Sequence, residues 1–219
     1  MANIELVIFD CDGVLVDSEK ITNQLLVNLL REYGIEYKLE AFVSRYVGTL
    51  LEEVINQISE EFKVAFPESF ISDYYQKAYV ELQQNLQEIN GVRNLIERLD
   101  VPFCVASNSQ ETKLIMMLKK VELLHYFEGK IFSATHVKQP KPAPDLYLKA
   151  AHTFNINTEN CFVIEDTPTG IRAGKAAGMT VYGYAGLFSE QALLNAGADN
   201  TFNQMDQLFT SGVHSKPKT

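Results

Sequence analysis

Two aspartates separated by one residue follow the first apolar run of the chain, within the stretch FDCDGVLVDS at residues 9–18. Asp and Gly are common in turns, so Asp10 and Asp12 taken alone are compatible with a turn or with a reaction centre. A carboxylate can attack phosphorus and form an aspartyl-phosphate. A second carboxylate on the same side of an extended backbone can serve as general acid and base. The pair therefore suggests Asp10 as nucleophile and Asp12 as acid and base, if the rest of the chain supplies the other groups.

Polar side chains also follow three later apolar runs. Ligands of an open α/β sheet bind outside the carboxyl ends of its strands, so these positions are where partners for Asp10 should lie. They are Ser107, Asn108 and Ser109 after residues 101–106, Lys141 after residues 130–133, and Glu165 and Asp166 after residues 161–164. Four strand ends in succession carry groups of complementary type, which favours one shared site over four unrelated turns.

Each of these groups has a role in phosphoryl transfer, which depends mainly on positioning and charge neutralisation. Carboxylates that converge on one crevice repel each other and imply a cation, and an all-oxygen site favours Mg²⁺. Ser107 offers a hydroxyl to a phosphate oxygen. Lys141 offers a positive charge to the transferring group and a partner to Asp10. The predicted metal ligands are Asp10, Asp12, Glu165 and Asp166.

The elements that must hold these residues alternate along the chain. Short apolar runs rich in β-branched and aromatic residues predict strands covered on both faces, as in a parallel sheet, at residues 4–9, 101–106, 130–133, 161–164 and 180–183. Helical patterns lie between them, at residues 92–99, 112–123, 144–154, 168–177 and 190–196. The alternation predicts an α/β fold with a doubly wound, Rossmann-like parallel sheet. Gly170, Gly174 and Gly178 recur at every fourth position, which favours close helix packing.

One interval breaks the alternation, because residues 16–88 contain no strand pattern. Apolar residues from Ile21 to Tyr33 share one helical face, and further helices are predicted at residues 40–46, 50–62 and 67–86. We therefore predict an all-helical cap domain at residues 16–88, inserted into a catalytic core of residues 1–15 and 89–210. Residues 211–219 are expected to be a disordered tail.

Composition excludes several other classes of protein. The chain has 219 residues, 46% of them hydrophobic, and a formal net charge of −9. An acidic chain without basic runs is not expected to bind nucleic acid or an anionic membrane, and no apolar run approaches the roughly 20 residues that span a bilayer. The three cysteines lie in or beside apolar runs and predict buried thiols. We expect a reduced, cytoplasmic setting and a monomer.

The four motifs FDCDGVLVDS, ASNS, KPAPDLY and IEDTPTGIRAGKAAGM together resemble those of the haloacid dehalogenase superfamily, specifically its β-phosphoglucomutase-like and phosphoglycolate phosphatase-like branch. The resemblance covers nearly the whole chain, in the family's motif order, with the helical insert where that branch carries its cap. It implies Asp10 as nucleophile and metal ligand, and Asp12 as acid/base and backbone-carbonyl ligand. Ser107 and Asn108 match the family's phosphate loop, Lys141 its lysine, and Glu165 and Asp166 its acidic metal-binding pair.

Two comparisons within the superfamily narrow the expected reaction. Asp12 argues for phosphoryl chemistry, because a dehalogenase has no leaving alcohol to protonate. The mutases of this branch carry a cap histidine and a cap arginine that handle a bisphosphate, and the corresponding places here are Thr22 and Leu51. We therefore predict a Mg²⁺-dependent phosphatase that hydrolyses a small phosphorylated metabolite, a sugar or sugar-acid phosphate, through phospho-Asp10. The alternatives are a sugar phosphomutase and a non-catalytic binding protein on the same fold.

Overall fold

The computed structural model describes residues 4–46 and 49–209. The chain divides into two compact units, one formed by Met1–Asp17 with Gln87–Thr219 and the other by Ser18–Leu86. The division falls after residue 17 and before residue 87, where the sequence placed the cap at residues 16–88. The predicted tail at residues 211–219 lies outside the described residues.

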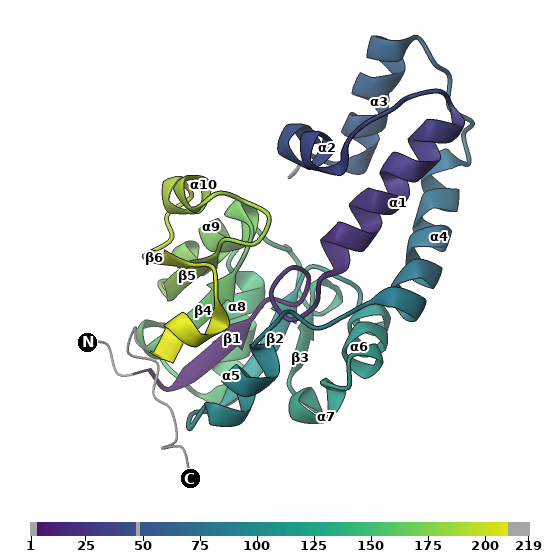
Figure 1. The fold of residues 1–219 in the computed structure, drawn as a ribbon. Coiled ribbons are helices and arrows are strands. Elements are labelled where there is room, and N and C mark those ends of the chain that lie inside the picture. Colours follow the sequence, from purple (N-terminus) through teal and green to yellow (C-terminus); the bar gives the residue numbers. More distant parts are fainter. Residues whose placement is uncertain (1–3, 47–48, 210–219) are drawn as a thin grey trace. The chain divides into compact units, whose positions relative to one another are not determined.

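The larger unit is built on a six-stranded sheet in the order β3-β2-β1-β4-β5-β6, in which every pair of neighbours is parallel (Figure 1). This confirms the predicted doubly wound α/β fold with a helical insert after the first strand. The strands are β1 (Leu6–Phe9), β2 (Phe103–Ser107), β3 (Ile131–Ser133), β4 (Cys161–Glu165), β5 (Thr180–Tyr184) and β6 (Asn200–Phe202). The sequence predicted the first five strands and missed β6.

Helices follow or precede each strand of this unit. They are α5 (Val92–Arg98), α6 (Glu111–Lys120), α7 (Leu124–Phe127), α8 (Asp145–Phe154), α9 (Pro168–Ala176) and α10 (Glu190–Asn195), with short 3₁₀ segments at Ala134–His136, Thr158–Asn160 and Met205–Phe209. The four-residue helix α7 was not predicted. In α9, Gly174 lets the helix approach β5, because a Cβ there would lie 2.6 Å from Val181 Cγ2.

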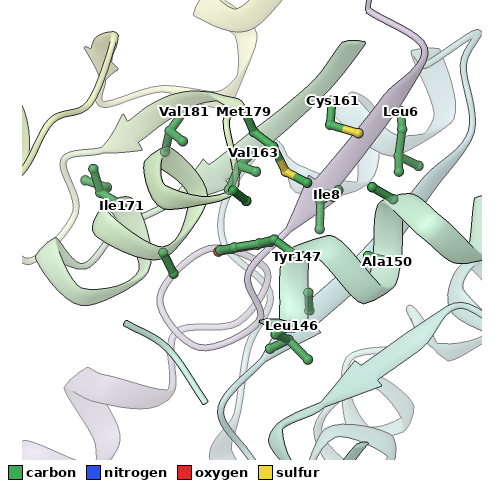
Figure 2. Packing of buried hydrophobic residues seen from close by; sticks show 14 of the residues in the cluster. Leu6, Ile8, Leu146, Tyr147, Ala150, Cys161, Val163, Ile171, Met179 and Val181 are labelled. Carbon is green, nitrogen blue, oxygen red and sulfur yellow. The ribbon is translucent and has the colours of Figure 1, made fainter. Parts of the chain in front are cut away.

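Strand β1 is buried on both faces. Leu6 and Ile8 belong to a cluster that includes Tyr147 and Ala150 of α8 (Figure 2). On the alternate positions, Phe9 packs edge-to-face against Phe103 and Phe127, with ring centroids 6.3 and 6.2 Å apart. Dense packing on two sides fixes the end of β1, and Asp10 is the first residue after this strand.

The chain leaves and re-enters this unit at one place. Val16 forms an isolated antiparallel bridge with Glu88. The N–H of Asp17 donates to the carbonyl of Gln87 at 3.0 Å, and the N–H of Ile89 donates to the carbonyl of Leu15 at 3.0 Å. The outgoing and returning segments are thus hydrogen-bonded to each other.

The smaller unit is helical, as predicted. It consists of α1 (Ser18–Glu32), α2 (Leu39–Tyr46), α3 (Leu51–Phe62) and α4 (Phe70–Asn85). Its own core includes Leu30, Phe42, Ile58 and Phe70. Within the described parts of both units, no helix is long and apolar enough to cross a membrane.

Candidate active site

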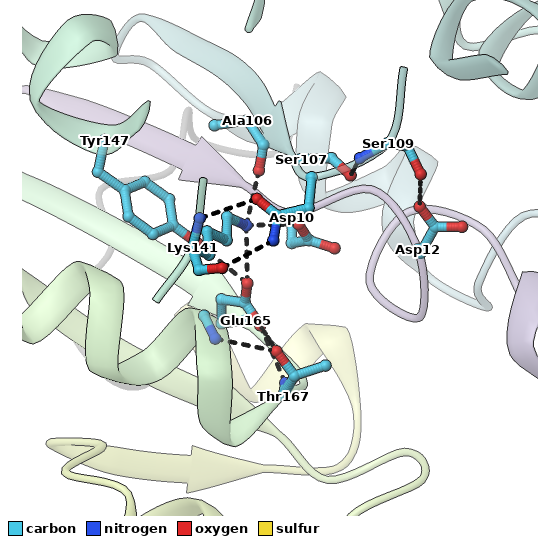
Figure 3. A network of polar contacts seen from close by, with 11 residues as sticks. Asp10, Asp12, Ala106, Ser107, Ser109, Lys141, Tyr147, Glu165 and Thr167 are labelled. Atoms are coloured by element: carbon cyan, nitrogen blue, oxygen red, sulfur yellow. Dashed lines mark hydrogen bonds and ion pairs between the residues drawn. The ribbon is translucent and has the colours of Figure 1, made fainter. Parts of the chain in front are cut away.

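A buried lysine joins the ends of three strands. Lys141, from the loop before α8, places its Nζ 2.6 Å from Asp10 Oδ1, 2.8 Å from Glu165 Oε1 and 2.8 Å from the carbonyl oxygen of Ala106 (Figure 3). Asp10 directly follows β1, Ala106 lies in β2, and Glu165 ends β4. Three of the predicted site residues, Asp10, Lys141 and Glu165, therefore meet at the carboxyl edge of the sheet.

The ionisable groups of this network shift each other's pKa. The pKa of Asp10 is raised to about 8, chiefly by burial; the carboxylates of Glu165 and Asp12 contribute to the rise, and the Lys141 ammonium opposes it. Burial by itself would lower the pKa of Lys141, but Asp10 and Glu165 hold it well above its ordinary value. Lys141 is thus a permanent cation shared by two carboxyl groups, and an additional cation would favour the ionised form of Asp10 that burial and the neighbouring carboxylates disfavour.

Both oxygens of Glu165 are engaged with protein donors. Oε1 also accepts from the hydroxyl of Tyr147 at 3.1 Å, and Oε2 accepts from the N–H and the hydroxyl of Thr167, each at 2.9 Å. A Cβ at Gly170 would lie 1.6 Å from Glu165 Oε1, so this glycine makes room for a carboxylate and does not only serve helix packing. These contacts associate Glu165 with Lys141, Tyr147 and Thr167, and its predicted part in metal binding, directly or through water, stays a prediction.

The predicted phosphate loop adjoins Lys141. Ser107 is buried, and its Oγ accepts from the N–H of Ser109 at 3.1 Å. The side chain of Asn108 bridges the main chain of Lys141, donating to its carbonyl and accepting from its N–H, both at 3.0 Å. The amide of Asn108 therefore fastens the lysine loop to the end of β2, and the phosphate contacts expected of Ser107 and Asn108 stay predictions.

Asp12 points to different partners from Asp10. Its Oδ2 accepts from the hydroxyl of Ser109 at 2.8 Å (Figure 3), and its Oδ1 accepts from Lys113 Nζ at 3.0 Å. The two aspartates nonetheless remain close enough for the charge of Asp12 to act on the pKa of Asp10. One carboxylate is thus tied to the buried lysine and the other to the start of α6.

The residues present fit a magnesium ion. Asp166 rests against the loop that carries Asp10 and Asp12, because a Cβ at Gly13 would lie 1.9 Å from Asp166 Oδ2. Gly13 has a φ of +76°, which also favours glycine. Over residues 4–46 and 49–209, no three His, Cys, Asp or Glu side chains form a cage of metal ligands. Mg²⁺ needs none, since it is usually held by one or two carboxylates together with waters and substrate phosphate.

Sequence reasoning missed three of the side chains in these networks: Lys113, Tyr147 and Thr167. Tyr147 packs its ring 4.7 Å from Lys141 Nζ as well as donating to Glu165. Thr167 caps α9 by accepting from the N–H of Gly170 at 3.0 Å. Tyr147 and Thr167 lie inside the quoted motifs KPAPDLY and IEDTPTG, which was the available signal. Lys113 lies outside all of the motifs.

Comparison with known proteins agrees with this geometry. A family model described as haloacid dehalogenase-like hydrolase matches residues 7–184. The chain is 36% identical over 183 residues to the 6-phosphogluconate phosphatase of Escherichia coli, covering 83% of each chain. It is 29% identical to a phosphorylated carbohydrates phosphatase of Thermotoga maritima, over 89% of this chain and 92% of that one.

The fold is also shared with solved structures. A conserved haloacid dehalogenase-like protein of unknown function from Agrobacterium tumefaciens superposes with a TM-score of 0.90 at 34% identity, over 95% of this chain and 97% of that chain. The motifs lie in the matched region, at the strand ends described above. The chain therefore belongs to the haloacid dehalogenase-like hydrolases, in the branch with a helical insert after the first strand, and is a phosphatase of that family.

Proposed function

We propose that this protein is a Mg²⁺-dependent phosphatase that hydrolyses a small phosphorylated metabolite of the sugar or sugar-acid type through a phosphorylated Asp10. The observation that carries the proposal is the contact between Lys141 and Asp10 at the end of β1, at 2.6 Å. It places a buried carboxylate beside a fixed positive charge, at the sheet edge where β2 ends in Ser107 and within electrostatic reach of Asp12.

In the first step, Asp10 attacks phosphorus and the ester P–O bond breaks. The ammonium of Lys141 stabilises negative charge on the transferring group, and the Ser107 hydroxyl donates to a phosphate oxygen. The protonated carboxyl of Asp12 gives its proton to the departing oxygen. The products are a neutral alcohol and an acyl phosphate on Asp10, with Asp12 left as a carboxylate.

In the second step, Asp12 accepts a proton from water as the water oxygen bonds to phosphorus. The bond between phosphorus and the Asp10 oxygen breaks, which releases inorganic phosphate and regenerates the Asp10 carboxylate. Asp12 finishes the cycle protonated, so one residue serves both half-reactions.

The carboxylates of Asp10 and Asp166 and the backbone carbonyl of Asp12 would hold Mg²⁺. When bound, the ion neutralises phosphate charge and offsets the repulsion between the site carboxylates. Glu165 is assigned instead to the orientation of Lys141, because its oxygens accept from Lys141, Tyr147 and Thr167.

Two observations favour a sugar-type substrate and hydrolysis. The relative that is 36% identical is named for 6-phosphogluconate. Thr22 and Leu51, which stand where mutases carry a histidine and an arginine, both line one cavity of about 180 Å³ within the helical unit. Among the described residues that line this cavity none is basic, and its polar side chains include Glu19 and Asn23. Such a lining does not favour a second phosphate, as a bisphosphate intermediate would require.

The test is phosphate release from a panel of sugar and sugar-acid phosphates with Mg²⁺, together with acid quench of the enzyme during turnover of ³²P-labelled substrate. We expect labelled protein that loses its label to hydroxylamine, as an acyl phosphate does. Asp10→Asn should abolish both label and turnover, whereas Asp100→Asn, an exposed position ahead of β2, should change neither. Full activity of Asp10→Asn would refute the mechanism, and conversion of a hexose 1-phosphate to its 6-phosphate without phosphate release would favour a mutase.

A further inference from the structure

Both oxygens of Asp12 are held by side chains from α6 and from the loop that leads into it. Oδ2 accepts from Ser109 Oγ at 2.8 Å and Oδ1 accepts from Lys113 Nζ at 3.0 Å. We propose that Ser109 and Lys113 are positioning residues that orient Asp12 for proton transfer to the leaving group, an inference that rests on the proposed function. We call the pair the Asp12 clamp.

The clamp closes on itself. Lys113 Nζ lies 3.1 Å from Ser109 Oγ and donates to it. The serine oxygen accepts from the ammonium, so its single proton is directed at Asp12. Two donors on two oxygens stop rotation of the carboxylate about its last bond.

The clamp is itself anchored to the core of the larger unit. The N–H of Ser109 donates to Ser107 Oγ at 3.1 Å, and its carbonyl accepts from Ser133 Oγ at 2.7 Å. Lys113 lies on α6, whose neighbouring residues Leu114 and Met117 are fully buried. Asp12 is therefore positioned by residues attached to the same strand ends that hold Lys141 and the phosphate loop.

Lys113 and Asp12 are partly exposed, so their contact should contribute little to the stability of the fold even if it positions Asp12 for catalysis. The side chains of Lys113 and Asp12 are 34% and 22% exposed, and ion pairs at partly solvated positions contribute about 1 kcal/mol or less to folding. Misplacement of a catalytic group, in contrast, can lower a rate about 10²-fold. Loss of Lys113 should therefore change the rate far more than the stability.

The rates with two different leaving groups distinguish a positioning role from a purely structural one. An alkoxide needs the proton from Asp12, whereas p-nitrophenolate leaves without one. The ratio kcat/KM reports the steps up to the first irreversible one, which here is release of the alcohol. For Lys113→Met we expect kcat/KM to fall about 10–100-fold with the best alkyl phosphate, and by less than about threefold with p-nitrophenyl phosphate.

Three comparisons complete the experiment. Lys113→Arg, which keeps a charged donor, should recover most of the lost rate, and Ser109→Ala should show the same preference for the activated substrate. Lys120→Met, at an exposed position later in α6, should match wild type. In an Asp12→Asn background, Lys113→Met should cause no further loss, because the group that it positions is gone. Thermal unfolding should confirm that every variant is folded.

The results separate the clamp from the mechanism on which it rests. If Asp12→Asn is impaired but Lys113→Met is fully active, slows both substrates equally, or adds its own loss to Asp12→Asn, the clamp is refuted and the mechanism stands. If Asp12→Asn hydrolyses the alkyl phosphate as fast as wild type, the proposed role of Asp12 is refuted, and the clamp with it.

Discussion

Lys141 Nζ lies 2.6 Å from Asp10 Oδ1, although 131 residues separate the two in the sequence. The side chains are only 3% and 10% exposed, so the pair is shielded from solvent. A buried ammonium is tolerated only where its charge is compensated, and Glu165 and the Ala106 carbonyl complete that compensation. The nucleophile and its electrostatic partner are therefore positioned by one another.

Replacing Lys141 by methionine should damage both folding and activity. Removal of one partner from a buried ion pair costs about 3–5 kcal/mol, because the other charge remains buried. We expect a clear drop in the midpoint of thermal unfolding and at least about a hundredfold loss of kcat. Lys141→Arg should not rescue activity, since a guanidinium cannot replace a compact ammonium at this position. A Lys141→Met protein with wild-type kcat would contradict the assigned role.

Stabilisation by Mg²⁺ should increase with pH up to about pH 8. The pKa of Asp10 is about 8 in the metal-free protein, so below that pH a proton competes with the ion for this carboxylate. The apparent affinity should rise roughly tenfold per pH unit between pH 6 and 8 and level off above, where Asp10 is already ionised. At saturating Mg²⁺ each tenfold step is worth about 1.4 kcal/mol, or roughly 3–6 °C in Tm.

Thermal unfolding with and without Mg²⁺ at pH 6, 7, 8 and 9 measures this dependence. Asp10→Asn should remove it, because an amide does not titrate in this range. A shift of Tm with Mg²⁺ that is equal at pH 6 and pH 8, or larger at pH 6, would contradict the prediction.

Two glycines of α9 should separate stability from activity. Alanine at Gly170 would place its Cβ 1.6 Å from Glu165 Oε1, and alanine at Gly174 would place it 2.6 Å from Val181 Cγ2. Both substitutions overpack the larger unit and should destabilise it by about 1–3 kcal/mol. Only Gly170→Ala displaces the carboxylate that orients Lys141, so only it should reduce kcat strongly. Equal kcat values for the two folded variants would rule out a special role for Gly170.

Most of the fold was accessible from the sequence because parallel strands are buried on both faces and appear as continuous apolar runs. This holds for β1, whose four residues LVIF are all buried. It fails for β6, whose residues NTF lie at the sheet edge with only Phe202 buried. It fails also for α7, because four residues are too few to show a helical period.

The site was predictable where it depends on topology and less so where it depends on side-chain direction. Asp10, Lys141 and Glu165 meet because strand ends share one edge of the sheet. The partners of Glu165 depend on how its carboxylate turns over Gly170, which no spacing reveals. Lys113 was missed because lysines on partly exposed helices are common. Only its spacing of four residues from Ser109 distinguishes it.

The bridge between Val16 and Glu88 bears on how such a protein could diversify. Since the outgoing and returning segments are bonded to each other, the ends of the insert are already spaced for a hairpin turn, whatever the length of the segment between them. Residues 18–86 are in this sense a cassette, which can be lengthened, exchanged or reduced to a short loop while β1 keeps its register. Selection on the choice of substrate can then act on one part of the gene while the residues that handle phosphate stay unchanged.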